Sequence, residues 1–411
     1  MYSFFKIWLS TAFSSGLRVI EFPFIIYFLT RSLIESPGIL ISDFGVFVSI
    51  LVGSTGFLLG LSTPVVLGVR YKIIIFYTLI SILISFLFLL FGFLIAFSIS
   101  SLTVNDVSIS LLLLMLFSQI SIAARRIKHG DLIRRKVPIN MAYSAFVRVT
   151  VTAFLCLIIP ARYVSIETAF SILLLGAVID TILVYLLPEK ASSGLNKSLD
   201  SKIKKAWKIF LSSGISSSLY LLQGFVVIVA LLSLGMEHRL EGWIIVFSFI
   251  SIYTSLVIDN ENIIASSAQD FNTYLGVNIG IIVLLLISLV WVSLEHGSQF
   301  YFVNLQGMDP LEFSNGLVYL AIIVAAISVL KQSIKGRVYF LQRMGFISFS
   351  ALAFVVFVFL GSTIFAKLFD FTNSAIAGCI LLLFGIVGEI VVLLLGSYRP
   401  YSMQPSKLNR R

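Results

Sequence analysis

The chain contains twelve apolar segments that can be read as crossings of a lipid bilayer, although the fourth and tenth are short. A membrane-spanning helix needs about 20 mostly apolar residues, because each residue advances the helix by about 1.5 Å. Only 12% of the residues are charged, compared with about 25% in a soluble domain. We therefore predict an all-α, polytopic membrane protein. The predicted spans are 8–29, 42–69, 73–97, 108–124, 138–159, 167–187, 209–234, 243–265, 275–294, 314–330, 345–366 and 374–396.

The beginning of the first span recurs at the midpoint of the chain. Residues 6–17 read KIWLSTAFSSGL, and residues 208–219 read KIFLSSGISSSL. Membrane proteins built from two similar halves commonly place a substrate pathway between them. We predict two six-helix lobes, 1–190 and 208–411, related by a pseudo-two-fold axis along the membrane normal and joined by a cytoplasmic linker at 191–207.

The distribution of basic residues predicts that both termini are cytoplasmic. In this orientation 23 of the 29 Lys and Arg residues fall in inner segments, including 125–136 and 331–343, and four fall in outer loops. Short cytoplasmic loops carry such an excess in membrane proteins. The formal net charge of +10 is explained by this topology and by contact with anionic membrane lipids, so it does not indicate nucleic-acid binding. Gathering an anionic substrate at the inner face is the alternative.

Several ionisable side chains lie inside the predicted spans, and four of them are the candidate substrate-binding residues: Arg18, Glu21, Arg148 and Asp180. Charges at membrane depth are costly and normally face a water-filled cavity or a partner. Arg18 and Glu21 are three residues apart, so they share a helix face and could pair. Asp180 could neutralise Arg148 or take part in ion coupling. Alternatively, Arg18 and Arg148 form a cationic cavity, since the planar guanidinium suits phosphate.

The sequence gives no indication of an enzyme. The two cysteines lie in apolar segments, and no Cys/His spacing typical of a metal site is present. No P-loop, GxSxG or HExxH motif occurs. We expect no catalytic residues, no metal and no cofactor.

Five segments of the sequence carry a resemblance to a known family: LSTAFSSGLRVIEF, DFGVFVSI, LGLSTPVVLGVRYK, RRIKHGDLIRRK and GEIVVLLL. Together they resemble the Wzx-like polysaccharide and O-antigen flippases of the multidrug/oligosaccharidyl-lipid/polysaccharide (MOP) exporter superfamily. The likeness extends over nearly the whole chain, although its motifs are mostly small or apolar residues. The chain has two spans fewer than the fourteen expected of lipid II flippases in the same superfamily.

The resemblance implies two lobes around a central cationic cavity in a bacterial inner-membrane protein. The implied substrate is an undecaprenyl-pyrophosphate-linked oligosaccharide, moved from the cytoplasmic to the periplasmic leaflet for O-antigen or lipopolysaccharide synthesis. A coupling ion (proton or sodium) and a polysaccharide polymerase are the implied partners. Two alternatives remain: a small-molecule or drug exporter of the same fold, and an O-antigen polymerase. A polymerase would be expected to have a large outer loop rich in arginine, whereas the longest predicted one, 295–313, has none.

Overall fold

The computed structural model confirms a helical membrane protein. The residues that the structure describes are 2–66, 69, 71–99, 108–135, 137, 139–187, 203–236, 240–256, 295–311, 313–340, 344–368 and 373–397. Within these ranges nine helices are long and apolar enough to cross a membrane, and no β-strand occurs. The predicted ninth span, at 275–294, lies outside the described residues, as does most of the predicted linker.

The N-terminal half provides six traverses of the bundle. The predicted second span consists of three short helices in series, separated by Thr55 and Leu61. The amide of Leu59 donates to the Thr55 carbonyl at 3.0 Å, which continues the helical hydrogen bonding through the first break. The helices are α1 (Tyr2–Leu29), α2 (Pro37–Ser54), α3 (Gly56–Gly60), α4 (Ser62–Val66), α5 (Tyr71–Ile99), α6 (Ile109–Arg134), α7 (Ile139–Ile158) and α8 (Ile166–Leu186).

Serine caps fix where α6 and α8 begin. Ser108 accepts a hydrogen bond from the Leu111 amide, and Ser165 accepts one from the Thr168 amide. Such caps satisfy amides that lack a partner in the first helical turn. They explain why the predicted starts of these two spans lie within one residue of the observed starts.

The C-terminal half repeats the arrangement. Its predicted seventh span consists of α9 and α10, with only Leu222 between them. The chain turns after α10 at Gly235, whose φ of +75° favours glycine. The helices are α9 (Ile203–Leu221), α10 (Gln223–Ser233), α11 (Leu240–Ser255), α14 (Glu295–Gln299), η4 (Phe300–Leu305), α15 (Asn315–Phe340), α16 (Met344–Leu368) and α17 (Ser374–Ser397).

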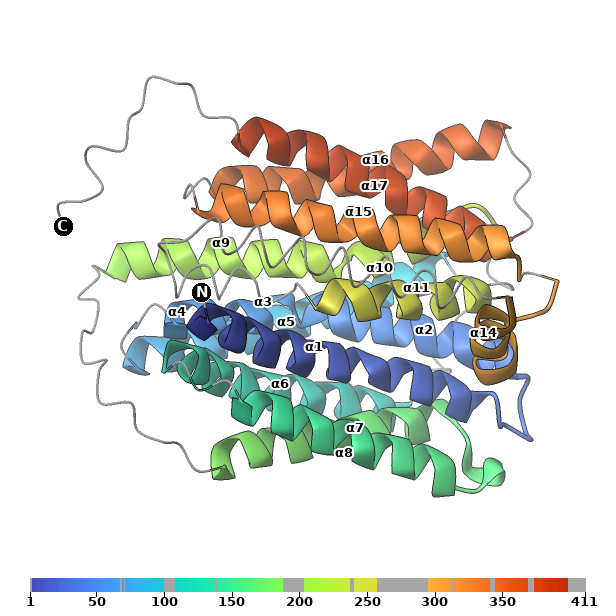
Figure 1. The fold of residues 1–411 in the computed structure, drawn as a ribbon, viewed down its shortest axis with the longest axis horizontal. Helices are drawn as coiled ribbons and strands as arrows, with labels where there is room; N and C mark the ends of the chain where they lie inside the picture. The colour runs from blue at the N-terminus through green and yellow to red at the C-terminus, as the bar shows by residue number, and fades with distance from the viewer. Residues whose placement is uncertain are drawn as a thin grey trace.

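The two halves form two groups of helices that lie side by side (Figure 1). Helices α1, α6, α7 and α8 lie on one side of the bundle, α15, α16 and α17 lie on the other, and α9 to α11 lie between them. Helix α1 begins and α17 ends at the same end of the bundle, as an even number of spans requires. In the span formed by α2 to α4, 83% of the residues in its apolar stretch are buried, so this span is central. In α5 the share is 33%, so α5 is peripheral.

The lobes approach each other closely at glycines. A Cβ atom added to Gly56 of α3 would lie 2.0 Å from the Cα of Ser218 in α9, so only glycine permits this backbone-to-backbone contact. At the opposite end of the bundle, Gln306 donates a hydrogen bond to the Pro23 carbonyl of α1 at 3.2 Å. These contacts bring the two halves of the chain together at both ends.

Two helices extend further than the sequence analysis predicts. Helix α6 continues to Arg134 and α15 continues to Phe340, each ten residues beyond the predicted end of its span. The expected contact of the basic inner segment 125–136 with anionic lipids is therefore wrong for Arg125 and Arg126, which are buried within the protein. Lys331 is likewise buried. These cations are tolerated because carboxylates on neighbouring helices accompany them, as described below.

Candidate functional site

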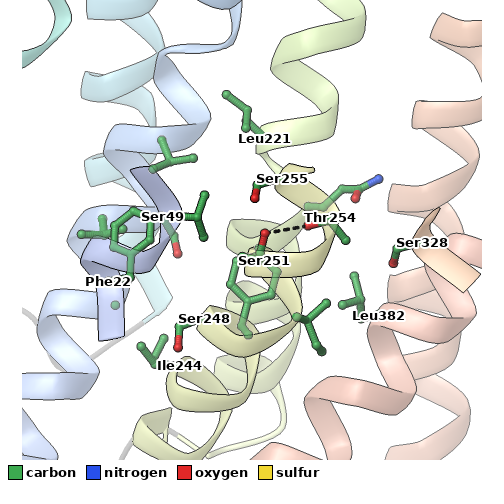
Figure 2. A pocket seen from close by; sticks show the side chains of 18 of the residues that line it. Phe22, Ser49, Leu221, Ile244, Ser248, Ser251, Thr254, Ser255, Ser328 and Leu382 are labelled. Carbon is green, nitrogen blue, oxygen red and sulfur yellow. Dashed lines mark hydrogen bonds between the residues drawn. The ribbon is translucent and has the colours of Figure 1, made fainter. Parts of the chain in front are cut away.

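A cavity lies between the two halves of the chain. It measures about 1030 Å³, counting the part that is open to solvent. In Figure 2, Phe22 and Ser49 lie on one side, Ser328 and Leu382 lie on the other, and residues of α11 lie between them. The lining residues are Val19, Phe22, Ile26, Phe44, Gly45, Val48, Ser49 and Val52 from α1 and α2, and Tyr220, Leu221, Gln223, Gly224, Ile244, Phe247, Ser248, Ile250, Ser251, Thr254, Ser255, Ser328, Lys331 and Leu382 from the C-terminal half.

The cavity wall is apolar with a set of hydroxyl groups. Most of these hydroxyls donate to a carbonyl of their own helix. Ser248 donates to Ile245, Ser255 donates to Ile252, and Ser328 donates to Val324. A hydroxyl that donates in this way keeps its oxygen lone pairs available as acceptors. The wall can therefore accept hydrogen bonds from a hydroxylated ligand while its remaining surface contacts apolar groups.

Lys331 of α15 is the charged side chain in this lining. Its Nζ lies 3.1 Å from Oε2 of Glu389 in α17 and donates to Oε1 of Gln223 at 3.1 Å. Gln223 in turn donates to Glu389 at 2.8 Å. Lys331 also lies over the ring of Tyr220, 5.1 Å from its centroid. Lys331 is only 1% exposed, so this set of partners allows an ammonium group to stay at membrane depth.

The four residues singled out from the sequence lie together, but inside the N-terminal half. Arg148 of α7 donates to Glu21 of α1 through Nε at 2.7 Å, and Thr152 donates to the same carboxylate at 2.9 Å. Arg18 donates to Asp180 of α8 through Nε at 2.8 Å. The partners are therefore exchanged relative to the expected Arg18–Glu21 pair, because each arginine reaches a carboxylate on a neighbouring helix.

Asp180 is the centre of this N-terminal cluster. Besides Arg18, its Oδ2 accepts from Nη1 of Arg125 in α6 at 2.7 Å and lies 3.6 Å from Nη1 of Arg148. The expected neutralisation of Arg148 by Asp180 is confirmed as a secondary contact. His129 of α6 completes the group, with Nε2 lying 3.3 Å from Nη2 of Arg18. None of the four predicted residues belongs to the described lining of the central cavity.

The two halves place their polar clusters on corresponding spans. The sequence repeat aligns Arg18 with Tyr220 and Glu21 with Gln223, and both members of the second pair are bound within a cluster. The fourth span of each half contributes a cation. Arg125 forms an ion pair with Asp180 in the N-terminal half, and Lys331 forms one with Glu389 in the C-terminal half. The carboxylates Asp180 and Glu389 both belong to the sixth span of their half. This correspondence supports the internal repeat.

The sequence analysis missed Lys331 because it ended the tenth span at residue 330. That span was only 17 residues long, short of the roughly 20 that a bilayer requires. Extending it to the required length would have placed Lys331 inside the membrane. Glu389 in the twelfth span was then the available partner.

No protein-family model matches the sequence, and no curated protein does either. Solved structures do match. An outward-facing multidrug resistance MATE family transporter of the MOP superfamily aligns with a TM-score of 0.63 at 13% identity, over 96% of this chain and 94% of that chain. The fold is that of the MATE transporters. The eukaryotic MATE transporter AtDTX14 aligns with a TM-score of 0.62 at 13% identity, over 96% and 95% of the two chains. An inward-facing MATE family transporter aligns with a TM-score of 0.60 at 12% identity, over 92% of this chain and 93% of that chain.

These alignments confirm the predicted architecture of about twelve membrane helices in two lobes. They cover nearly the whole of each chain, so the MATE fold accounts for both halves. At 12–13% identity they establish a shared fold. The likeness to the MOP exporters and to their Wzx flippases, which the sequence motifs suggest, stays a prediction.

Proposed function

We propose that the protein is an alternating-access transporter that moves undecaprenyl-pyrophosphate-linked oligosaccharides from the cytoplasmic to the periplasmic leaflet. In this proposal it resides in the bacterial inner membrane with both termini in the cytoplasm. The two lobes rock about the central cavity, as in other transporters built from repeated halves.

The observation that carries the proposal is Lys331 in the cavity lining. An ammonium group held at membrane depth favours an anionic ligand and repels a cationic one. The diphosphate of the substrate would compete with Glu389 for this lysine. Arg18, Glu21, Arg148 and Asp180 then act on the transport cycle by fixing α1, whose Val19, Phe22 and Ile26 face the cavity.

Other parts of the seam between the halves suit the rest of such a substrate. The cavity hydroxyls can accept hydrogen bonds from sugar hydroxyls. On the side of α5 a second hollow, of about 620 Å³, is lined by apolar residues of α2, α5, α10 and α16 together with Leu222. Several α5 residues around it are exposed and apolar, including Phe91 at 60% exposure. We assign the prenyl tail to this hollow, since hydrocarbon chains bind there without loss of polar contacts.

A small-molecule exporter is the second candidate. The supporting observation is the predominance of aromatic and aliphatic residues in the cavity wall, which is typical of drug-sized sites. The positive charge of Lys331 decides which small molecules this second candidate would carry. A cationic drug would be disfavoured, whereas an anionic amphiphile would be bound.

Deleting the gene and measuring both surface polysaccharide and lipid-linked glycan tests the proposal. We expect surface polymer to be lost and complete repeat units to accumulate on the cytoplasmic leaflet. Accumulation on the periplasmic leaflet would instead identify a polymerase, and unchanged pools would favour the small-molecule exporter.

Complementation with variants then tests Lys331. A Lys331→Met/Glu389→Gln double variant removes both charges, so neither is left buried alone. It should reach wild-type abundance and fail to restore transport, while Lys331→Arg should restore it at least in part. Full transport by the double variant would show that Lys331 does not contact the substrate.

A further inference from the structure

The N-terminal cluster around Asp180 contains more hydrogen-bond donors than acceptors. Arg18, Arg125 and Arg148 face two carboxylates, Glu21 and Asp180, so the cluster carries one excess positive charge. A buried excess of positive charge is costly unless an anion is bound near it.

Two arginine donors in this cluster have no partner among the described residues. They are Nη1 of Arg18 and Nε of Arg125, and both atoms are buried. The two guanidinium groups are adjacent, because each donates to Oδ2 of Asp180, at 2.8 and 2.7 Å. A buried donor that lacks an acceptor costs about 1–3 kcal/mol, and more when it is charged. Such groups are rare in folded proteins and call for a ligand or water.

His129 supplies a third donor of this kind. Its ring is fully buried, and Nδ1 has no partner among the described residues. Arginine has no acceptor atom, so the contact between Nη2 of Arg18 and Nε2 of His129 requires Nε2 to accept. In the neutral ring the proton is then on Nδ1, which becomes a donor. Arg18 contacts both Asp180 and His129, so the three donors belong to one continuous group.

We propose that this cluster is a binding site for a phosphate-bearing oxyanion, inside the N-terminal half and separate from the central cavity. A phosphate group offers several acceptor oxygens and negative charge, which match the three donors and the excess of positive charge. The Glu21–Arg148 pair, which is also hydrogen bonded to Thr152, holds α1 and α7 together beside the site. The inference stands on the N-terminal half alone and does not require the proposed flippase activity.

Titration of the full-length protein in nanodiscs with inorganic pyrophosphate tests the site, with chloride at equal ionic strength as the reference. Arg125→Lys keeps the charge opposite Asp180 but removes the Nε donor. His129→Gln can keep an acceptor for Arg18 but has no group equivalent to Nδ1–H. Loss of one hydrogen bond to a charged group should weaken binding about 10- to 100-fold. Arg135→Lys, at the C-terminal cap of the same helix, is the matched control, because it alters a partly exposed pair with Asp131, and it should bind like the wild type.

Saturable pyrophosphate binding that is weakened by Arg125→Lys and by His129→Gln supports the site. A second titration, with a polyprenyl diphosphate in the nanodisc, distinguishes its sources. Binding with the same dependence on Arg125 and His129 assigns the site to a lipid headgroup, and binding of inorganic pyrophosphate alone assigns it to a free oxyanion. No saturable binding of either ligand would overturn the inference, as would binding that both variants leave unchanged.

Discussion

Breaking the Lys331–Glu389 pair from one side should be far more costly than removing both charges together. The two side chains are 1% and 3% exposed and lie 3.1 Å apart. In Lys331→Met the Glu389 carboxylate loses the ammonium group and keeps the hydrogen bond from Gln223. In Glu389→Gln the Lys331 ammonium keeps Gln223 and the face of the Tyr220 ring. Each single variant therefore leaves a buried charge without its counter-charge.

The expected magnitudes follow from this geometry. Removing one partner of a buried ion pair costs about 3–5 kcal/mol, whereas replacing both is often close to neutral. We expect about 3 kcal/mol for Glu389→Gln, because the Tyr220 ring and Gln223 partly compensate the lysine. Lys331→Met should cost at least as much, and the double variant less than about 1 kcal/mol. The resulting coupling energy is about 5 kcal/mol or more.

Reversible unfolding by SDS in mixed micelles measures these free energies, with intrinsic tryptophan fluorescence as the signal. The wild type, both single variants and the double variant form a complete cycle. If the double variant is destabilised by the sum of the single effects, the two charges do not stabilise each other. The electrostatic account of this cluster would then be wrong.

Two further substitutions test other parts of the structure. Asp180→Asn should destabilise the protein by about 3 kcal/mol or more, because Arg18 and Arg125 both bind this carboxylate; Asp131→Asn, which loses only the partly exposed pair with Arg135, should cost less than about 0.5 kcal/mol. Equal losses of unfolding free energy would contradict the central role of Asp180. Gly56→Ala should lower the melting temperature and the amount of folded protein, because its Cβ would meet the Ser218 backbone, whereas Gly345→Ala, with nothing within 4 Å, should behave like the wild type. A normal melting temperature for Gly56→Ala would show that the lobes are not in close contact there.

The positions of the spans could be predicted because apolar length is a local property of the sequence. The predicted ends of the first, fifth and sixth spans lie within one residue of the ends of α1, α7 and α8. Errors arise where a helix continues past a buried charge. Hydropathy treats Arg125 and Lys331 as the beginning of a loop, whereas the structure compensates them with Asp180 and Glu389.

The partners of the charged residues could not be predicted in the same way. Glu21 and Arg148 are 127 residues apart in sequence, and Arg18 and Asp180 are 162 apart. Their pairing depends on how α1 packs against α7 and α8. The local rule for residues one helical turn apart instead favoured Arg18 with Glu21. Membrane depth singled out four members of this buried cluster, while tertiary packing decides which partners they bind.

The long separation between Arg18 and Asp180 has a consequence for biogenesis. The ribosome completes α1 well before it synthesises α8, so Arg18 reaches the bilayer 162 residues ahead of this counter-charge. A lone arginine in the hydrocarbon is costly, which disfavours the release of α1 by itself. We therefore expect the early helices to stay beside the insertion machinery until the sixth traverse emerges. A nascent chain truncated before α8 would hold Arg18 and Arg125 without the carboxylate that joins them, and quality-control proteases would meet it in that state.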